Sequence, residues 1–375
     1  MTFKTEKLRE GQKMISSLEI DFLPVGEGEH SGDAIAVRWI QNGVAKVLVY
    51  DGGTKASGRL LVDHVRSHYG TTYVDYVVNS HPDNDHASGL SLVLEELTVG
   101  ELWMHQPWNY SAQICDYFHD GRITSESLTR RLQEKMAAAY ELEKLAEKKG
   151  IKVYEPFAGS AIGIFRVLSP TSDRYVHELV PAFEKSPELK KSESIFDSAL
   201  FGWVKEAAQA FVAELWTGES LPETVTTSAE NESSAVLFAK IENHGGYLLT
   251  GDAGLDTLRA SADYARSIGI DLPSQVTFVQ IPHHGGRHNV STETLNLLVG
   301  PPSSGETTNA AKTAFVSASE KAPTHPKRKV TNAFKRRGFQ VFATKGKSIR
   351  HGFNQPYRMN WGPAVQLPFF SEVEA

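Results

Sequence analysis

The first third of the chain alternates short apolar segments with polar turns and amphipathic stretches. The apolar segments have the length and composition of β-strands and cover residues 18–25, 34–40, 44–50, 74–79 and 101–105. Helical patterns over residues 60–69 and 87–97 separate the later strands. This order predicts a mixed sheet with helices on its outer face.

A second group of apolar segments follows residue 150 and carries its own helices. Strands are predicted over residues 151–154, 162–168, 234–242, 247–252, 276–281, 314–317 and 340–344, of which the last is the final strand predicted. Helices are predicted over residues 255–268 and 329–337. The two halves therefore resemble each other in kind, because each pairs strands with helices.

Residues 105–150 and 171–230 differ from the rest of the chain. They contain helical pieces joined by polar or proline-rich links, and residues 221–230 look irregular. The helical pieces are predicted over residues 125–149, 175–183 and 194–213. We interpret both segments as helical insertions within a single domain that covers residues 1–375. The helix over residues 125–149 is expected to pack across the site as a lid or to form a dimer contact.

Composition and charge narrow the class of protein. With 375 residues, 40% of them hydrophobic and 22% charged, the chain has the composition of a globular protein with one large domain or two. The net charge of −6 argues against a globally basic nucleic-acid binder. The single cysteine, Cys115, excludes an intramolecular disulfide and a cysteine-rich zinc site, and this fits a cytoplasmic protein.

No segment of the sequence indicates a membrane protein. The charged segment over residues 1–13 lacks the apolar core of a signal peptide. No stretch approaches the ~20 apolar residues that are needed to span a membrane. The sequence leaves open whether the protein forms a homo-oligomer or binds a partner protein.

Candidate metal ligands are concentrated between His81 and His86. The segment Ser80-His81-Pro82-Asp83-Asn84-Asp85-His86 follows a predicted strand and precedes a predicted helix. A helix cap would explain Asp83 or Asp85 alone, but not the whole pattern of two imidazoles and two carboxylates. Four ligands this close suit two ions, with His81 and Asp83 on one and Asp85 and His86 on the other.

Two later strands also end in residues that bind metals. Asp252 follows one strand and the pair His283-His284 follows another. Each has an ordinary alternative, a turn residue or surface histidines, but beside the first cluster they favour a binuclear site. Asp252 can bridge two ions and His283 or His284 can complete one coordination sphere. Imidazoles and carboxylates without thiolates suit Zn²⁺, Mn²⁺ or iron, so two divalent ions, zinc or manganese, are the expected cofactors.

A concentrated basic segment lies between Lys327 and Arg350. It includes the candidate substrate-binding residues Lys327, Lys335, Arg336 and Arg337. One interpretation is a solvated helix face, and the other is a track for a phosphate backbone beside the metals. Aromatic residues such as Trp103 and Trp108 offer a similar choice between stacking on bases and packing inside the protein.

These motifs together resemble the metallo-β-lactamase fold superfamily, and within it the hydrolase domain of the competence DNA-uptake channel ComEC. The resemblance rests on residues 22–28 with 33–35, residues 49–53, 80–90, 248–252 and 282–286, Asn231 with Ser234, and His325-Pro326. It implies a four-layer αββα sandwich with helical insertions and a metal-bound hydroxide as nucleophile.

The resemblance also implies roles for individual residues. The implied metal ligands are His81, Asp83, Asp85, His86, Asp252 and His283. Asp85 and His284 are the implied catalytic residues, with His284 near the leaving group or the substrate. Asn231, Ser234 and His325 are the implied substrate contacts.

Two features depart from the superfamily pattern. Asp83 stands where many members have histidine, which makes that ion site harder and more tolerant of Mn²⁺. No clear histidine supplies the usual ligand in the middle of the chain, because neither His119 nor His177 follows a predicted strand. Asn231 or Ser234 is expected in that region instead, and one ion is expected to bind weakly.

The sequence therefore predicts a metal-dependent hydrolase, favoured as a phosphodiesterase or nuclease that acts on DNA or another nucleic acid. The first alternative is a hydrolase of a small ester, lactone or phosphoester. The second is a regulatory module that binds metal without turnover, against which the complete ligand set argues.

Overall fold

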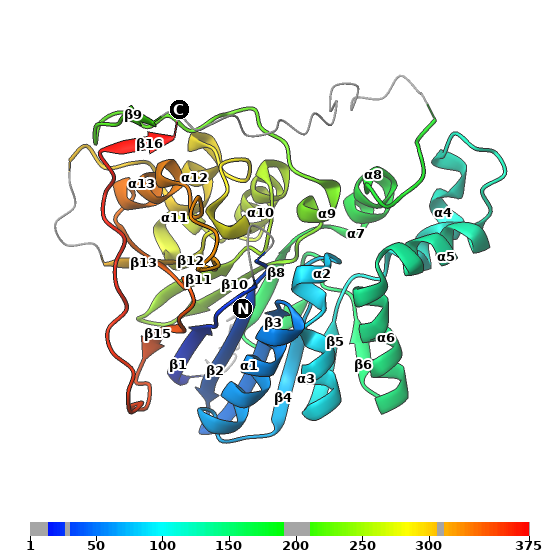
Figure 1. Cartoon of the computed structure of the whole chain (residues 1–375), viewed down its shortest axis with the longest axis horizontal. Coiled ribbons are helices and arrows are strands. Elements are labelled where there is room, and N and C mark those ends of the chain that lie inside the picture. Colours follow the sequence, from blue (N-terminus) through cyan, green and yellow to red (C-terminus); the bar gives the residue numbers. More distant parts are fainter. Residues whose placement is uncertain (1–13, 27–30, 191–210, 306–310, 375) are drawn as a thin grey trace, which may run out of the picture.

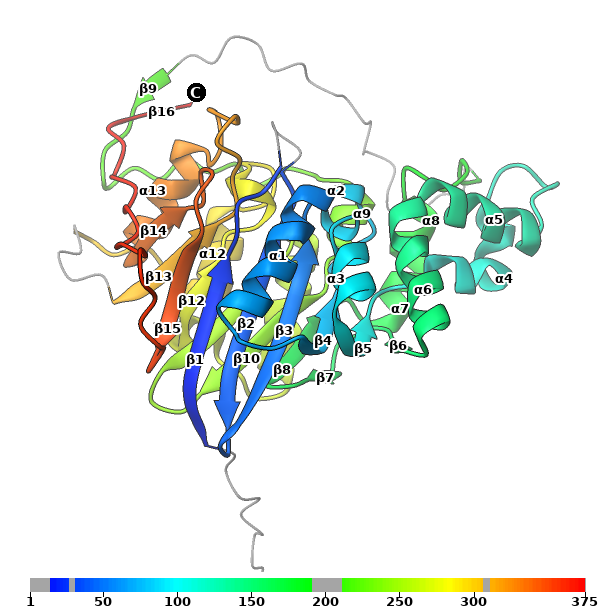
Figure 2. The same ribbon diagram turned by 60° about the horizontal axis from the view of Figure 1, so that its bottom comes forward.

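A computed structural model describes residues 14–26, 31–190, 211–305 and 311–374 of the chain. Two seven-stranded sheets pack face to face, with helices on the outer face of each (Figures 1 and 2). This is the αββα sandwich that the sequence predicts.

The first sheet has the strand order β15-β1-β2-β3-β4-β5-β6. Its strands are β15 (Ile349–Phe353), β1 (Ile15–Phe22), β2 (Ala34–Gln41), β3 (Val44–Gly52), β4 (Tyr73–Val78), β5 (Thr98–Trp103) and β6 (Lys152–Tyr154). Strands β15 to β3 are antiparallel, whereas β3 to β6 run parallel. Parallel strands bring their carboxyl ends to one edge of a sheet, and β4 delivers the first metal motif there.

The second sheet has the order β14-β13-β12-β11-β10-β8-β7. Its strands are β14 (Phe339–Ala343), β13 (Lys312–Val316), β12 (Val276–Gln280), β11 (Gly245–Leu249), β10 (Val236–Ile241), β8 (Phe165–Ser169) and β7 (Ala161–Ile162). Strands β11 to β14 run parallel, so the carboxyl ends of β11 and β12 also share an edge. Asp252 and His283-His284 follow these two ends.

Three apolar layers hold the sandwich together. Alternating inward side chains such as Phe22, Tyr50 and Phe278 form the layer between the sheets. The outer face of the first sheet is covered by α1 (Lys55–Ser67), α3 (Leu90–Glu96) and α6 (Ala137–Lys149). The second sheet is covered by α10 (Leu255–Ser267), α11 (Leu272–Gln275), α12 (Thr292–Val299) and α13 (Arg328–Arg336).

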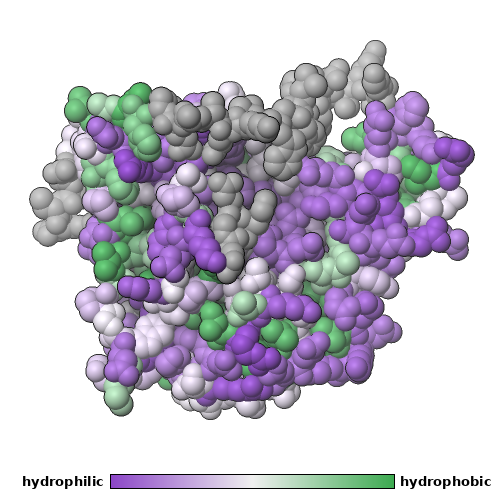
Figure 3. Space-filling model, viewed as in Figure 1, coloured by the Kyte–Doolittle hydropathy of each residue, from purple (hydrophilic) through white to green (hydrophobic). Residues whose placement is uncertain are grey.

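The helix predicted over residues 125–149 is two helices. Helix α5 (Ser125–Lys135) ends at Met136, whose φ of −113° and ψ of 45° leave the helical region, and α6 begins at Ala137. Helix α5 and the short helices η1 (Pro107–Tyr110), α4 (Ser111–Ile114) and η2 (Cys115–Tyr117) lie to one side of the sandwich (Figure 1). Hydrophilic residues dominate the surface over α5 and α6 (Figure 3). The roles of lid or dimer contact stay predictions.

Between residues 171 and 232, the described part of the chain contains only short elements. These are α7 (Ser172–Arg174), η3 (Tyr175–Leu179), α8 (Val180–Ala182), β9 (Phe211–Ala213) and α9 (Ala229–Glu232). The helix predicted over residues 194–213 falls mostly outside the described residues, and its described end, residues 211–213, is a strand. Whether residues 105–150 and 171–230 are insertions within one domain stays a prediction.

The sequence missed several elements in the last third of the chain. Helix α12 was not predicted, although Ser291 caps it by accepting a hydrogen bond from the backbone of Thr294. The prediction that residues 340–344 form the last strand was wrong, because β15 returns to the first sheet and β16 (Glu372–Glu374) pairs with β9. Among the described helices, none has both the length and the apolar character to cross a bilayer.

Candidate metal centre

Most of the predicted metal ligands belong to metal-binding groups of the described chain. They follow parallel strands of the two sheets, whose carboxyl ends lie at one end of the sandwich (Figure 2). His81 follows β4 on the turn into α2 (Asn84–Ala87), and His86 lies in α2 itself. Asp252 follows β11, and His283 and His284 follow β12 in the short helix η4 (His283–Gly285). The first sheet therefore contributes one group of ligands and the second sheet contributes the other.

The Oδ2 atom of Asp252 is the centre of this arrangement. Four imidazole Nε2 atoms lie within ion-pair distance of it: His86 at 3.3 Å, His283 at 3.8 Å, His284 at 3.9 Å and His81 at 4.0 Å. The carboxylate is buried, and the Oγ atom of Ser234 accepts a hydrogen bond of 3.1 Å from its backbone N–H. A single oxygen surrounded by imidazole nitrogens is typical of a carboxylate that binds metal.

Each of the four imidazoles is fixed through its other ring nitrogen. The Nδ1 atoms contact Ser80 Oγ at 2.9 Å for His81, Asp51 Oδ2 at 2.9 Å for His86, Asn289 Oδ1 at 2.7 Å for His283 and the Ser317 carbonyl at 3.1 Å for His284. Outer partners of this kind orient metal-binding histidines and leave Nε2 for the ion. The protein therefore holds the four rings ready for a ligand at the centre.

The donor atoms fit a divalent cation. Among the described residues, the buried atoms without a hydrogen-bond partner include His81 Nε2, His86 Nε2 and Asp252 Oδ1. Buried polar atoms are nearly always paired, so their convergence indicates a missing partner. Donor atoms within 4.8 Å of one another form the groups His81–His86–Asp252, Asp85–His86–His284 and Asp252–His283–His284. Nitrogen and oxygen donors without sulfur suit zinc, manganese or iron.

Electrostatics at the centre also favour a cation. Burial alone would lower the pKa of His86, but the carboxylates of Asp252 and Asp51 raise it well above its usual value. Burial opposes ionisation of Asp252, yet His86, His283 and His284 hold its pKa well below the usual range. Burial raises the pKa of Asp33 to about 8, and the charges of Asp252 and Asp51 add to that effect. Several carboxylates thus compete for too few positive charges.

The loop that carries His283 and His284 has an unusual backbone. Both residues have positive φ, 47° and 56°, and so does Gly285, at 77°. A Cβ atom on Gly285 would lie 2.4 Å from Cβ of Pro326, so only glycine allows this close approach. The carbonyl of Gly285 accepts a hydrogen bond of 3.0 Å from the backbone of Lys327. The segment around His325 therefore supports the histidine loop.

Asp83 and Asp85 differ in their surroundings. An oxygen of Asp85 lies in one of the metal-binding groups, beside His86 and His284. Asp83 Oδ2 is 3.7 Å from His81 Nε2, but its Oδ1 accepts a hydrogen bond of 2.7 Å from Nζ of Lys185. Sequence reasoning missed Lys185, because no local motif marks it and it lies in the segment 171–230.

Neither His119 nor His177, the mid-chain histidine candidates, belongs to the metal-binding groups of the described chain. The His177 Nδ1 atom lies 2.8 Å from the Tyr117 hydroxyl. The Asn231 amide donates to Thr227 Oγ1 at 2.8 Å. Ser234 is closer to the centre, because its Oγ lies 3.4 Å from Nδ1 of His81 and also contacts Asp252.

Three residues that orient or charge the centre were not predicted as site residues. Asp51 holds His86 and accepts a hydrogen bond of 2.7 Å from the backbone of Ser80. Asp33, Asp51 and His86 form a further group whose donor atoms lie within 4.8 Å of one another. Asp33 Oδ2 accepts a hydrogen bond of 2.7 Å from Nε2 of Gln280. Asn289 fixes His283. Asp33 and Asp51 flank strand ends in segments that carry the family resemblance, and this position was the signal available.

The prediction of a basic phosphate track was wrong at Arg336 and Arg337. Arg336 is 1% exposed, pairs with Glu214 at 2.9 Å and donates to the Trp216 carbonyl at 2.7 Å. Arg337 is 4% exposed and pairs with Glu219 at 2.6 Å. Residues 211–219 cover α13, and both guanidinium groups therefore form ion pairs inside the protein.

Two further members of the basic segment, Lys335 and Lys327, are also engaged inside the protein. Lys335 Nζ donates to the Leu367 carbonyl at 3.0 Å, and Lys327 is buried. His325 is half-buried, and its Nδ1 lies 3.2 Å from Thr324 Oγ1. Trp108 is buried against Tyr140, as in the packing alternative.

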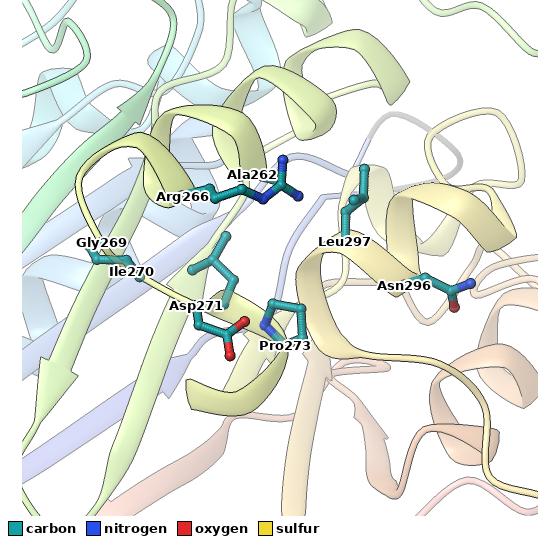
Figure 4. A pocket seen from close by; sticks show the side chains of 9 residues that line it. Ala262, Arg266, Gly269, Ile270, Asp271, Pro273, Asn296 and Leu297 are labelled. Carbon is teal, nitrogen blue, oxygen red and sulfur yellow. The ribbon is translucent and has the colours of Figure 1, made fainter.

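A separate pocket of about 350 Å³ lies between the end of α10 and the helices α11 and α12 (Figure 4). Arg266, Asp271 and Asn296 supply polar groups to its wall, and Ile270 and Leu297 supply apolar ones. None of its lining residues belongs to the metal-binding groups of the described chain. The pocket is therefore not part of the metal centre.

The family comparison agrees with this geometry. A model of the metallo-β-lactamase superfamily matches residues 28–114 of this chain, which include His81, Asp83, Asp85 and His86. Together with the sandwich fold, the match supports a relationship between this chain and the metal-dependent hydrolases of that superfamily. No curated protein sequence matches the chain. The closer similarity to the ComEC hydrolase domain stays a prediction.

Solved structures show only distant likeness. Unliganded yeast PDE1 aligns with a TM-score of 0.41 and 10% identity, covering 89% of this chain and 99% of that chain. The hydrolase AbOPH in the beta lactamase superfamily aligns with a TM-score of 0.28 and 9% identity, covering 64% and 74%. A long form of RNase Z from yeast aligns with a TM-score of 0.31 and 12% identity, covering 80% and 36%. Because each TM-score is low, none of the three carries an argument about this chain.

Proposed function

We propose that this chain is a metal-dependent phosphodiesterase, with nucleic acid as the first substrate to test. The observation that carries the proposal is the convergence of four imidazole Nε2 atoms on Oδ2 of Asp252. A site that only stabilised the fold would need a closed set of ligands. Here Asp85 and His283 are partly exposed, which leaves access to the centre from solvent.

The residues that could hold a divalent cation are His81, Asp85, His86, Asp252, His283 and His284. A bound cation supplies Lewis acidity toward a phosphoryl oxygen and an activated water at neutral pH. Asp252 offers the charge that binds the ion, and Asp51 fixes the ring of His86 against it. His284 is held by the Ser317 carbonyl, so its Nε2 faces the centre and not bulk solvent.

The carboxylate content of the centre favours phosphodiesters. Asp85, Asp252 and the nearby Asp33 and Asp51 make the site harder than an all-imidazole site. Hard oxygen ligands suit Mn²⁺ and Mg²⁺, the ions that most often serve phosphoryl chemistry.

A hydrolase of a small ester, lactone or phosphoester is the second candidate. It is favoured by the burial of Arg336 and Arg337, because these residues cannot neutralise a long phosphate backbone. A metal-binding module without turnover is the third candidate. The partly exposed Asp85 and His283 argue against it.

The experiment is a hydrolysis panel with Mg²⁺, Mn²⁺ or Zn²⁺. The substrates are bis(4-nitrophenyl) phosphate, single- and double-stranded DNA, RNA and a lactone. Wild type should cleave the phosphodiester reporter, whereas Asp85→Ala should not. Asp263→Ala is the matched control, because Asp263 is an exposed carboxylate on α10 paired with Arg266.

Three outcomes separate the candidates. Cleavage of DNA or RNA as well as the reporter supports a nuclease. Cleavage of the lactone alone would move the small-substrate hydrolase ahead. Metal binding without turnover on any substrate would contradict the proposed function and favour the regulatory module.

A further inference from the structure

The ammonium group of Lys185 lies beside the half of the centre where His81 and Asp83 were expected to bind a second ion. We propose that Lys185 replaces that second ion, so that the chain binds a single divalent cation on the side of Asp85, His86 and His284. This inference rests on the proposed function and concerns the number of ions at the same site.

The contacts of Lys185 support the replacement. Its Nζ lies 2.7 Å from Oδ1 of Asp83 and 3.3 Å from Oε1 of Glu230. Glu230 is fully buried, and the side chains of Lys185 and Asp83 are only 28% and 26% exposed. A lysine held between two carboxylates in this way is a fixed positive charge and not a mobile surface group.

The distribution of ligands agrees with one ion. Asp83 belongs to none of the metal-binding groups in the described part of the chain, although it stands between His81 and His86 in the motif. Without Asp83, and without a mid-chain histidine, the only donor that the second ion would not share with the first is His81, because His86 and Asp252, which are grouped with it, also belong to groups on the other side. On the other side, Asp85, His86 and His284 supply three donors. Asp252 Oδ2 adds a fourth, because it lies 3.3 Å from Nε2 of His86 and 3.9 Å from Nε2 of His284.

Charge repulsion adds to the loss of ligands. An ammonium group at hydrogen-bond distance from Asp83 already neutralises that carboxylate. A divalent cation bound through the same carboxylate would stand next to this ammonium group in a partly buried environment, where like charges are screened less than in bulk water. Binding of the second ion therefore requires that Lys185 move away.

The helices outside the sandwich hold Lys185 in place. Arg131 on α5 donates from Nε to the Lys185 carbonyl at 2.9 Å, and from a terminal nitrogen to the Ser186 carbonyl at 3.4 Å. The Ser186 hydroxyl donates to the Val180 carbonyl in α8 at 2.6 Å. The segments 105–150 and 171–230 thus meet at Lys185, and both help to position its ammonium group beside Asp83.

The test is the number of ions bound by the metal-free, full-length chain. Calorimetric titration with Mn²⁺ and elemental analysis after gel filtration should give one ion per chain for wild type. Lys185→Gln should gain a second ion, because Asp83 is released. Lys185→Arg keeps the charge and should stay at one. The matched control is Lys190→Gln, whose ammonium group donates to the Asp116 carbonyl away from the centre.

A second variant keeps the test decisive if Lys185→Gln does not fold. Asp83→Asn should still bind one ion per chain, because Asp83 is not among its ligands. Two ions in wild type, or loss of an ion in Asp83→Asn, would overturn the single-ion inference and leave the proposed function standing. Failure of wild type to bind any divalent ion would overturn the proposed function, and the inference with it.

Discussion

The Nε2 atom of His86 lies 3.3 Å from the Oδ2 atom of Asp252, although the two residues follow strands of different sheets. His86 lies in the short helix α2 that follows β4, and Asp252 follows the end of β11. The centre therefore exists only when the two sheets are packed in register. Mutations that loosen the packing between the sheets should weaken metal binding without touching a ligand.

Replacing Asp252 with asparagine should remove the charge that the four imidazoles share. We expect metal affinity to fall by more than the ~10–100-fold that loss of an outer partner costs. Equilibrium dialysis with Mn²⁺ or Zn²⁺ measures the change. Asp256→Asn is the control, since Asp256 is an exposed carboxylate near the start of α10. Equal affinity in both variants would exclude Asp252 as a ligand.

Asp51→Asn should affect the centre indirectly. The amide has one accepting oxygen where the carboxylate has two, so it loses a contact with Ser80 or with Nδ1 of His86, and the ring is no longer fixed. Metal affinity should fall by ~10–100-fold, as for other outer partners of metal-binding histidines. The exposed Asp63 on α1 provides the control variant, Asp63→Asn. An unchanged affinity in Asp51→Asn would show that His86 needs no such support.

Arg336→Gln should damage stability and not nucleic-acid binding. The change leaves Glu214 buried without its partner and removes the hydrogen bonds to residues 215–218. The free energy of unfolding should fall by about 3–5 kcal/mol, measured by urea denaturation. The exposed Lys347 serves as the control in Lys347→Gln. If Arg336 bound DNA instead, stability would hold and the salt dependence of binding would flatten.

Acid should destabilise the protein through Asp21. Burial alone would raise the pKa of Asp21, but His64 and Arg358 lower it to about 2, below its ordinary value of 3.8. Because the folded pKa is the lower one, Asp21 stabilises the fold above about pH 4. This stabilisation, about 2 kcal/mol, is lost as the pH falls from 4 toward 2.

Urea denaturation at a series of pH values between 6 and 2 measures this loss. In Asp21→Asn the part of the pH dependence that Asp21 causes should disappear, leaving a shallower decline in the free energy of unfolding. An identical decline in wild type and Asp21→Asn would contradict the assignment to this carboxylate.

The sequence predicted those parts of the structure that depend on local patterns. Strand and helix periodicity predicted a mixed sheet with outer helices, and the family resemblance implied the αββα sandwich. His81, His86, Asp252 and His284 were identified because each follows an apolar strand. Parallel strands of one sheet end at one edge, so residues at such ends meet in space whatever their distance along the chain.

The sequence could not predict what depends on distant partners. The local sequence around Arg336 and Arg337 is typical of a basic surface. In the structure residues 211–219 cover it, and the sequence of α13 does not indicate that Glu214 and Glu219 pair with these arginines. Lys185 was missed for the same reason, because its place at the centre depends on a hydrogen bond to Asp83, which is far away in the chain. Helix α5 was joined to α6 because the break at Met136 has neither proline nor glycine.

The return of β15 to the first sheet affects how the protein is made. Strand β1 pairs on one side with β2, its immediate successor, but on the other side with β15. During synthesis on the ribosome, the second edge of β1 stays uncovered until residues 349–353 emerge. An unpaired apolar edge is a template for aggregation, so this interval is a period of risk for the nascent chain.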